Sequence, residues 1–249
     1  MTARAAAILP VRHGSTRLPG KPLLDETGKP LIQHVWEQVS RATRLDPVIV
    51  ATDDERILAA AKAFGAEAVM TSPTCASGSD RVAEVVASRD ESLVVNVQGD
   101  EPEIDPGDLD RMVERLAGGD EEMVTLARPL QPGEEDLLAD PHTVKVVMDD
   151  AGRALYFSRS PIPHGTDPMG AHAHLGVYAW RREALLRFAA APPAALELRE
   201  RLEQLRAMAL GMRIAVVLSE HPSLGIDTPA DYARFVERQL SGNASEPTP

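Results

Sequence analysis

The segment Ala5-Ala6-Ala7-Ile8-Leu9-Pro10 runs directly into Val11-Arg12-His13-Gly14-Ser15-Thr16-Arg17-Leu18-Pro19-Gly20-Lys21-Pro22. The first part is a short apolar run, which predicts a buried strand. The second part carries Arg12, Arg17 and Lys21 on a chain whose net charge is −12. Because like charges repel one another, this crowding of cations after a strand indicates an anionic ligand, and a phosphate chain fits best.

The loop has the chemistry of an anion site. Gly14 and Gly20 allow positive φ and close approach of the backbone, so amide N–H groups can line a concave surface. Side-chain donors are the Ser15 and Thr16 hydroxyls, the Arg12 and Arg17 guanidinium groups and the Lys21 ammonium. Guanidinium groups bind phosphate bidentately, and an ammonium acts as a mobile point charge.

Other interpretations fit the residues of the loop less well. It is not a P-loop, because five residues separate Gly14 from Gly20 and Pro22 stands where a Ser or Thr would hold magnesium. No GxGxxG pattern follows the strand, which argues against a nicotinamide dehydrogenase. The plain alternative is a solvated basic turn. Its place after the first strand favours binding, because open parallel sheets bind ligands beyond the carboxyl ends of their strands.

Composition excludes several classes of protein. The 249 residues include 38 acidic and 26 basic side chains, so the basic face that nucleic acid or an anionic membrane requires is missing. The single cysteine, Cys75, cannot form an intramolecular disulfide. No apolar run approaches about 20 residues, and no signal-peptide core precedes the loop. These features predict a cytoplasmic protein.

Strands and helices alternate over the first half of the chain. The apolar pattern predicts strands at 5–10, 47–51, 67–70, 93–97 and 123–127, and helices at 31–42, 55–64, 80–87 and 106–117. Repeated strand, crossover helix and strand units form parallel sheets with helices on both faces. We therefore expect an α/β fold with a doubly wound, mostly parallel central sheet.

The pattern changes from Arg128 onward. Residues 144–148 and 154–157 predict an antiparallel hairpin, because the link between them is too short for a parallel crossover. A strand at 175–180, helices at 181–189 and 196–209, a strand at 213–218 and a helix from Thr228-Pro229 follow. We expect one domain over 1–240, with a mixed arm at about 128–195 that covers a substrate or a second subunit. Residues 241–249 are expected to be a disordered tail.

Two acidic segments are candidates for a metal site. Asp100 follows the apolar strand at 93–97, so it faces the same crevice as the cationic loop, and Glu101 precedes a proline. Asp227 lies just before the last helix. Each has the alternative role of capping a nearby helix. Carboxylate oxygens opposite a phosphate chain are the usual ligands of magnesium, so Asp100 and Asp227 together predict a magnesium site.

Two further groups remain open to two interpretations. The segment Ala76-Ser77-Gly78-Ser79-Asp80-Arg81 either caps a helix or binds a base edge and a phosphate. His172 and His174 fall on one face of a strand, as zinc ligands would, but no further ligand lies near them in the sequence. Both roles stay open for the first group, and for His174 we prefer a ligand contact without zinc.

The chain resembles the 3-deoxy-manno-octulosonate (KDO) cytidylyltransferases, also called CMP-KDO synthetases, over residues 6–240. The resemblance rests on Ser15-Thr16-Arg17-Leu18-Pro19-Gly20-Lys21-Pro22-Leu23, Ala51-Thr52-Asp53, Val94-Val95-Asn96-Val97-Gln98-Gly99-Asp100-Glu101-Pro102, Val144-Lys145-Val146-Val147, Tyr156-Phe157-Ser158-Arg159, His174-Leu175-Gly176-Val177-Tyr178, Leu202-Glu203-Gln204-Leu205-Arg206 and Asp227-Thr228-Pro229. The number of pieces and their order make the match specific.

The resemblance implies an activity and a site. It implies a glycosyltransferase-A-like nucleotidyltransferase that couples CTP to KDO with Mg²⁺, releases pyrophosphate and forms a homodimer. It places CTP at Arg12, Ser15, Thr16, Arg17, Lys21, Ser77, Gly78 and Arg81, and the metal at Asp100 and Asp227. It places the sugar acid at Gln98, Arg159, His174, Tyr178, Glu203 and Gln204. Lys21, Arg17, Asp100 and Asp227 are then the residues expected to act in catalysis.

The reaction needs little covalent help from the protein. In-line attack of an anomeric hydroxyl on the α-phosphorus depends on alignment and charge neutralisation, so no covalent intermediate is expected. Three alternatives remain: activation of 8-amino-KDO, activation of a sialic-acid-like sugar, and a nucleotide-binding relative without turnover. Ser15-Thr16-Arg17-Leu18-Pro19 argues against the sialic-acid type, which normally reads Ser-Lys-Arg-Ile-Pro, and the intact Lys21, Asp100 and Asp227 argue against the third.

Overall fold

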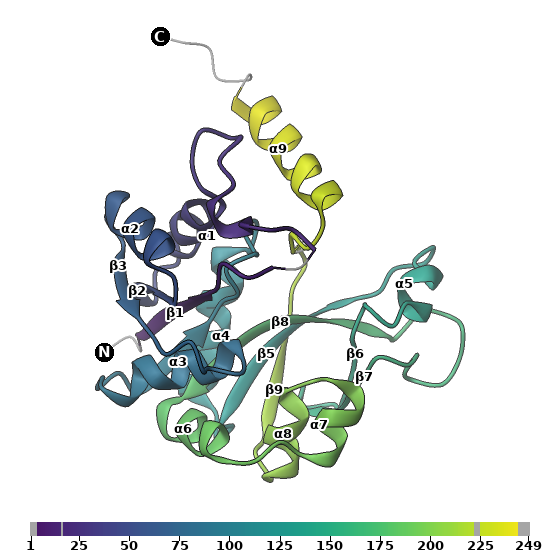
Figure 1. Ribbon diagram of the computed structural model, residues 1–249. Coiled ribbons are helices and arrows are strands. Elements are labelled where there is room, and N and C mark those ends of the chain that lie inside the picture. The colour runs from purple at the N-terminus through teal and green to yellow at the C-terminus, as the bar shows by residue number, and fades with distance from the viewer. Residues whose placement is uncertain (1–3, 16, 222–224, 244–249) are drawn as a thin grey trace.

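A nine-stranded sheet forms the centre of the described part of the molecule (Figure 1). The structure is a computed structural model that describes residues 4–15, 17–221 and 225–243. The strands of the main path are β1 (Ala5–Val11), β2 (Leu45–Thr52), β3 (Glu67–Met70), β4 (Leu93–Asn96), β5 (Met123–Pro129), β8 (His172–Arg181) and β9 (Ile214–Leu218). Their order across the sheet is β3-β2-β1-β4-β8-β5-β9.

Strand directions confirm the predicted fold class. β1 pairs in parallel with β2 and β4, β2 with β3, and β5 with β9. β8 enters between β4 and β5 and runs antiparallel to both. The carboxyl ends of β1 and β4 therefore meet at one edge of the sheet, and the chain that follows each strand lies at that edge.

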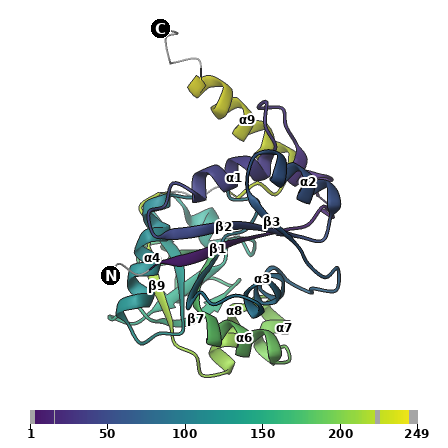
Figure 2. The ribbon, with the colours of Figure 1, turned by 90° about the vertical axis from the view of Figure 1, so that its left-hand side faces the viewer.

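Helices cover both faces of the sheet, as Figure 2 shows. The buried side chains of α1 (Leu31–Val39), α2 (Glu55–Ala63) and α4 (Pro106–Gly118) form one core cluster. The second cluster holds those of α3 (Gly78–Ala87), α6 (Arg182–Ala190) and α8 (Gln204–Ala209). Along β1, Ala7 and Leu9 belong to the first cluster while Ala6 and Ile8 belong to the second. Since successive strand residues point to opposite faces, an unbroken apolar run is what a sheet covered on both sides requires.

One predicted helix is wrong. The single helix expected at 196–209 is divided into α7 (Ala195–Glu200) and α8, because Arg201 adopts the left-handed conformation with φ of 56°. The Leu202 N–H bonds to the Glu197 carbonyl at 3.2 Å, which is the pattern that closes a helix after a left-handed residue. Leu202 is thereby buried in the second core cluster. The periodicity of charges continued across the break and concealed it.

Other boundaries differ by a few residues. β3 has the predicted bounds, whereas α1 ends three residues before the predicted end. α3 begins two residues earlier than predicted, because Ser77 and Asp80 form a reciprocal capping box. The short α5 (Glu135–Ala139) and the 3₁₀ turn η1 (Lys21–Leu23) were not predicted. None of these differences moves a strand.

The predicted hairpin forms part of an arm that continues the sheet. β6 (Lys145–Met148) and β7 (Ala154–Ser158) pair antiparallel, and β6 also pairs with β8. The tip of the hairpin returns to the sheet, where the Val216 N–H donates to the Gly152 carbonyl at 2.8 Å. The arm is therefore fixed at both ends, through β8 and through β9.

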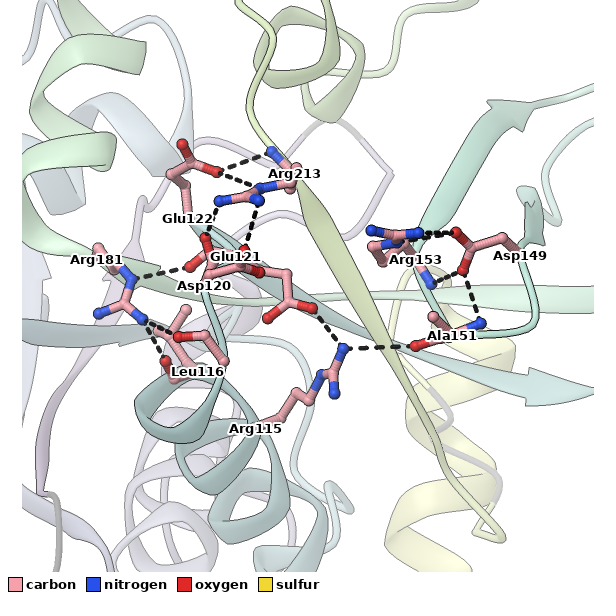
Figure 3. A network of polar contacts seen from close by, with 11 residues as sticks. Arg115, Leu116, Asp120, Glu121, Glu122, Asp149, Ala151, Arg153, Arg181 and Arg213 are labelled. Atoms are coloured by element: carbon pink, nitrogen blue, oxygen red, sulfur yellow. Dashed lines mark hydrogen bonds and ion pairs between the residues drawn. The ribbon is translucent and has the colours of Figure 1, made fainter.

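A network of charged side chains surrounds that tip (Figure 3). Arg115 binds the Glu121 carboxylate and donates to the Ala151 carbonyl at 3.5 Å. Arg213 pairs with Asp120 at 2.6 Å, and Arg153 pairs with Asp149 at 2.8 Å. Arg181 donates to the carbonyls of Leu116, Gly119 and Glu121. The network joins the end of α4, the start of β9 and the hairpin at the amino end of β5.

The last helix, α9 (Pro229–Asn243), begins at the predicted proline. Tyr232 and Phe235 pack with Leu18 and Ile226, which ties the helix to the loop after β1. Residues 241–243, expected in the tail, are helical, and 244–249 lie outside the described residues. Among the described helices, none combines the length and the apolar character needed to cross a bilayer.

An ion pair between Arg206 of α8 and Glu197 of α7 fixes the two short helices to each other. Two Arg206 nitrogens bind the two Glu197 oxygens at 2.9 and 2.5 Å, and the guanidinium lies 4.4 Å from the centre of the Phe188 ring. The side chains are 9% and 10% exposed. Burial opposes ionisation of Glu197, but the hydrogen bonds from Arg206 and the Ala194 N–H outweigh it, so the Glu197 pKa lies below 4.5.

Replacing Arg206 with methionine is expected to lower the free energy of unfolding by about 3 kcal/mol, because the Glu197 carboxylate would be left buried and unpaired. Urea unfolding measures this loss. Since the folded-state pKa of Glu197 is depressed, the pair contributes fully above its unfolded pKa and loses its effect as the pH falls below about 4.5. The exposed Arg199→Met on α7 serves as the control and should cost less than about 0.5 kcal/mol. A loss below about 1 kcal/mol for Arg206→Met would show that Glu197 finds another partner.

Candidate active site

The loop after β1 places Lys21 beneath the carboxyl end of the sheet. Leu18 packs into the cluster with Leu31 and Phe235, and the Ser15 hydroxyl accepts from the Leu18 N–H at 3.2 Å. Gly20 has φ of 69°, a conformation that L side chains rarely adopt, and it turns the chain into η1. Lys21 is the first residue of that 3₁₀ turn, so its side chain is directed by a rigid backbone.

Lys21 joins the two predicted carboxylates. Its Nζ lies 2.7 Å from Asp100 Oδ2, 2.7 Å from the Ile226 carbonyl oxygen and 3.5 Å from Asp227 Oδ1. The Ile226 N–H donates to the Asp100 carbonyl at 2.9 Å, which fixes the two segments together. Arg17 approaches the other Asp227 oxygen at 3.2 Å. The predicted meeting of the N-terminal loop with Asp100 and Asp227 is therefore observed.

A cleft of about 410 Å³ opens above this ion-pair group. Its walls include Arg12, Ser15, Arg17, Lys21, Gln98, Asp100 and Asp227. The ends of β1 and β4 approach closely here, because a Cβ on Gly99 would lie 2.8 Å from Val11 Cγ2. A glycine at 99 is needed for that approach, and it keeps the floor of the cleft open to a ligand.

A smaller hollow of about 150 Å³ adjoins the cleft and shares Arg12 and Gln98 with it. Ser77 and Gly78 of the α3 start line it, together with Cys75, Ala76 and Arg81. The Ser77 hydroxyl accepts from the Asp80 N–H at 3.1 Å, so Ser77 is a helix cap that also borders the hollow. A Cβ on Gly78 would lie 3.2 Å from Gln98 Oε1, so glycine lets the helix start close to the Gln98 amide.

Arg81 is held inside the wall of this hollow. Its guanidinium binds Asp53 Oδ2 at 2.7 Å and the Thr71 hydroxyl, and the residue is 4% exposed. Two of its nitrogens are therefore committed to the protein. Arg81 borders the hollow. Its bonds to Asp53 and Thr71 leave the side chain little freedom to reach outward to a phosphate, the contact that the sequence suggested.

Several residues expected to bind the sugar acid cluster between β8 and α8. The Tyr178 hydroxyl donates to Gln204 Oε1 at 3.3 Å, and burial raises the Tyr178 pKa. The His174 ring is stacked against Tyr178, with ring centres 5.7 Å apart, and its Nε2 lies 2.9 Å from the Thr125 hydroxyl. Burial lowers the His174 pKa to about 3, so this imidazole is neutral.

Two polar groups of this cluster are buried. Gln204 is 2% exposed, and its Nε2 is buried without a hydrogen-bond partner among the described residues. An unmatched buried amide is costly, so this nitrogen is a donor without an acceptor in the ligand-free protein. Glu203 accepts from the Ser79 hydroxyl at 2.7 Å, and burial raises its pKa.

Two predicted residues do not join these groups. Arg159 donates to the carbonyls of Pro141, Glu200 and Arg201, so it links the arm to the end of α7. The reason is local, because the left-handed turn at Arg201 presents carbonyl oxygens that need donors. Of the residues expected to bind the sugar acid, only Gln98 borders the cleft or the hollow. Thr16 lies outside the described residues.

Sequence reasoning did not predict the contacts of the polar residues beneath the site. Asp53 holds Arg81, and Ser79 and Asn96 are fully buried behind Gln98. The signal for Asn96 was present, since an asparagine ends an otherwise apolar strand and a buried amide needs partners. The Ile226 carbonyl, which binds Lys21, had no signal because every residue carries one.

The donor set at Asp100 and Asp227 fits a hard divalent cation. Both carboxylates approach the same positive charge, the Lys21 ammonium, in the ligand-free protein. Magnesium typically takes one or two carboxylates and completes its shell with water and phosphate oxygens. Within the described residues, no group of three or more His, Cys, Asp or Glu side chains has metal-binding geometry, so the zinc alternative at His172 and His174 gains no support.

Comparison with known proteins agrees with this geometry. The family model described as cytidylyltransferase matches residues 6–214. The 3-deoxy-manno-octulosonate cytidylyltransferase of Anaeromyxobacter sp. (strain Fw109-5) is 50% identical over 236 residues, which cover 93% of this chain and 95% of that protein. The protein of the same description from Geotalea uraniireducens (strain Rf4) is 44% identical over 248 residues, covering 94% and 98%.

Solved structures extend the comparison. The structure of CMP:2-keto-3-deoxy-manno-octonic acid synthetase complexed with CTP superimposes with a TM-score of 0.89 at 39% identity, covering 96% of this chain and all of that one. A cytidylyltransferase from Leptospira borgpetersenii serovar Hardjo-bovis (strain JB197) has a TM-score of 0.64 at 17% identity, which shows the shared fold alone.

Proposed function

Since the chain belongs to the 3-deoxy-manno-octulosonate cytidylyltransferase family, we propose that it transfers CMP from CTP to the anomeric hydroxyl of KDO and releases pyrophosphate. The observation that carries the proposal is the approach of Lys21 to both Asp100 and Asp227 at the base of a cleft lined by Arg12 and Arg17. The same cleft therefore contains basic side chains that can bind a triphosphate and carboxylates that can bind a metal ion.

The triphosphate of CTP occupies the larger cleft in this proposal. Arg12 and Arg17 bind phosphate oxygens with their guanidinium groups, and Ser15 and Thr16 add hydroxyl donors. Lys21 is placed to neutralise the charge that develops on the departing pyrophosphate. The pairing of Arg17 with Asp227 supports this, because Arg17 already lies beside the carboxylate that faces the phosphates.

The cytidine moiety occupies the smaller hollow. Ser77 and Gly78 bring the amino end of α3 to it, and Arg81 forms its wall. The hollow shares Arg12 and Gln98 with the cleft, so a nucleoside there continues directly into the triphosphate. Gly78 keeps the hollow open by adding no side chain beside Pro10 and Gln98.

The sugar acid lies against Gln98, His174, Tyr178, Glu203 and Gln204, with Arg159 at the edge of the arm. The unmatched Gln204 Nε2 supports this placement, because a sugar hydroxyl or carboxylate would accept its hydrogen bond. The neutral His174 ring offers a hydrogen bond and a flat apolar face rather than a charge.

Mg²⁺ is the proposed cofactor, held by Asp100 and Asp227. When bound, it supplies charge neutralisation at the phosphates and lowers the pKa of a hydroxyl beside it. The residues of the chain then align the anomeric hydroxyl with the α-phosphorus and exclude water, which is most of what in-line transfer needs. No covalent intermediate with the protein is expected.

A homodimer is also proposed. Leu155 of β7 and Leu196 and Leu198 of α7 are 59%, 49% and 66% exposed. β7 and α7 are joined by the bond from the Ser158 hydroxyl to Glu200 at 2.8 Å, so these leucines belong to neighbouring elements. Exposed apolar side chains on adjoining elements favour contact with a second copy of the chain.

Pyrophosphate release tests the function. With CTP, Mg²⁺ and KDO we expect release at the same rate as formation of CMP-KDO, and at least about a hundredfold less with UTP in place of CTP. The control panel offers 8-amino-KDO and sialic acid under the same conditions. If one of these sugars is turned over and KDO is not, the natural substrate is a related acidic sugar instead of KDO. CTP binding without release from any sugar would identify a non-catalytic relative.

A further inference from the structure

A chain of hydrogen bonds runs from Glu203 to the cleft through residues that the proposed function does not use. The Ser79 hydroxyl donates to Glu203 Oε1 at 2.7 Å, and Asn96 Nδ2 donates to the Ser79 oxygen at 3.3 Å. Gln98 Nε2 then donates to Asn96 Oδ1 at 3.0 Å. Glu203 precedes α8, Ser79 belongs to α3 and Asn96 ends β4, so the bonds cross three elements.

The direction of every bond in this chain follows from its first member. The Ser79 hydroxyl has a single proton, and it donates that proton to Glu203 Oε1. Ser79 can then only accept from Asn96, which turns the Asn96 amide nitrogen toward Ser79 and its oxygen toward Gln98. Gln98 must present its nitrogen to that oxygen, and its own Oε1 faces away from Asn96.

Because these side chains are buried, the direction of the hydrogen bonds cannot easily reverse. Ser79 and Asn96 are both 0% exposed, so bulk water does not reach them to supply substitute partners. A Cβ on Gly78 would lie 3.2 Å from Gln98 Oε1 and 3.3 Å from Gln98 Nε2, so the amide is packed closely against the start of α3. Gln98 borders both the cleft and the smaller hollow. The amide that meets the ligand is therefore held in one orientation.

We propose that Ser79 and Asn96 are positioning residues that fix Gln98 with its Oε1 toward the sugar acid. The ligand group that contacts Gln98 Oε1 is then a hydrogen-bond donor, namely a hydroxyl of the sugar. The sugar carboxylate points away from Oε1, because the two oxygens repel each other. Gln98 borders the cleft and the hollow proposed for CTP, and its hydrogen bonds lead away from them to Glu203, the neighbour of Gln204 in the proposed sugar cluster. The sugar would then lie where these two sides meet. The ligand part of this inference rests on the proposed function.

A double-mutant cycle between Ser79→Ala and Gln98→Ala tests the positioning role. The measurement is the Kd of KDO by calorimetry, with α,β-methylene-CTP bound so that turnover is not required. Ser79→Ala in the natural chain is expected to raise the Kd about tenfold, in line with loss of one oriented hydrogen bond. In the Gln98→Ala background the same change is expected to raise it less than about twofold, because Ser79 acts through Gln98.

Equal effects of Ser79→Ala in both backgrounds would overturn the proposal, since a merely structural role of Ser79 would be additive. An increase in the Kd of the CTP analogue with that of KDO unchanged would overturn the assignment to the sugar. Ser88→Ala, at the other end of α3, is the matched control, because among the described residues the Ser88 hydroxyl bonds only to the nearby Val85 carbonyl. It should leave both affinities unchanged.

The ligand-free protein provides a second readout. In ¹⁵N spectra, the Gln98 amide proton bound to Asn96 is expected to be protected from exchange in the natural chain and to lose that protection in Ser79→Ala. Unchanged protection would overturn the hydrogen-bond direction. If KDO does not bind the natural chain, the proposed function and the ligand assignment fail together, while the exchange measurement still decides the role of Ser79 and Asn96.

Discussion

Replacing Asp100 with alanine is expected to lower kcat by about a thousandfold while the fold remains intact. Asp100 is one of the two carboxylates proposed to hold Mg²⁺, and it faces the cleft beside Lys21. Its side chain is 30% exposed and pairs with Lys21, so its removal creates no buried cavity. Pyrophosphate release measures the loss, and circular dichroism with thermal unfolding measures the fold.

Two variants sharpen this prediction. Asp100→Asn keeps the size and removes the charge, so a loss close to that of alanine assigns the effect to the carboxylate. Glu103→Ala removes an acidic side chain of the same segment that pairs with Arg238, and kcat should stay within about twofold. Activity near that of the natural chain in Asp100→Ala would reject the metal role of Asp100.

The fold was largely predictable because its strands are short apolar runs. In β1 every residue is buried, and Pro10 and Val11 end the strand at the cleft. Such runs can only be satisfied between two helical layers, which is why the α/β class and the strand positions followed from the sequence. The order of the strands, with β8 inserted between β4 and β5, depends on long-range pairing that local patterns do not encode.

The break between α7 and α8 was unpredictable for a different reason. Arg201 has a left-handed backbone, a conformation in which an arginine is uncommon. No glycine marks the turn, and the charge spacing fits one continuous helix. Burial of Leu202 and the pair of Arg206 with Glu197 stabilise the two-helix form, and both are tertiary interactions. The same turn supplies the carbonyls that bind Arg159 and keep it from the cleft.

The candidate site, like the fold, could be predicted only in part. Lys21, Asp100 and Asp227 were found from the sequence because each is a charged residue beside a strand end or a helix start. Their meeting followed from the rule that ligands lie beyond the carboxyl ends of parallel strands. The bonds from Glu203 to Gln98 were not found, because a sequence does not say which buried polar side chains meet. The residue types identify candidate site residues, but the partners and directions of their hydrogen bonds follow only from the three-dimensional structure.

Replacing Lys21 with methionine is expected to have two effects of opposite sign. The first is a loss of about a hundredfold in kcat, because the cation that neutralises the departing pyrophosphate is removed. The second is tighter binding of Mn²⁺ to the ligand-free protein, by about tenfold. In the natural chain the Lys21 ammonium lies between Asp100 and Asp227, and its removal leaves two carboxylates without their counter-charge. Electron paramagnetic resonance of free Mn²⁺ measures the second effect.

Arg17→Met is the control that distinguishes two causes of a change in Mn²⁺ affinity: the position of the Lys21 ammonium and the overall charge of the loop. Arg17 touches Asp227 from outside at 3.2 Å and is 61% exposed, so its loss should change Mn²⁺ affinity less than about threefold. Lys21→Met with unchanged Mn²⁺ affinity would show that the carboxylates separate once the lysine is gone. Equal gains in both variants would show that overall charge, rather than the position of Lys21, sets metal affinity. Among the described basic residues, Lys21 alone contacts both carboxylates, so the larger gain in Mn²⁺ affinity is expected for Lys21→Met. In the natural chain, the nucleotide phosphates would then attract the Lys21 ammonium away from the carboxylates when CTP binds.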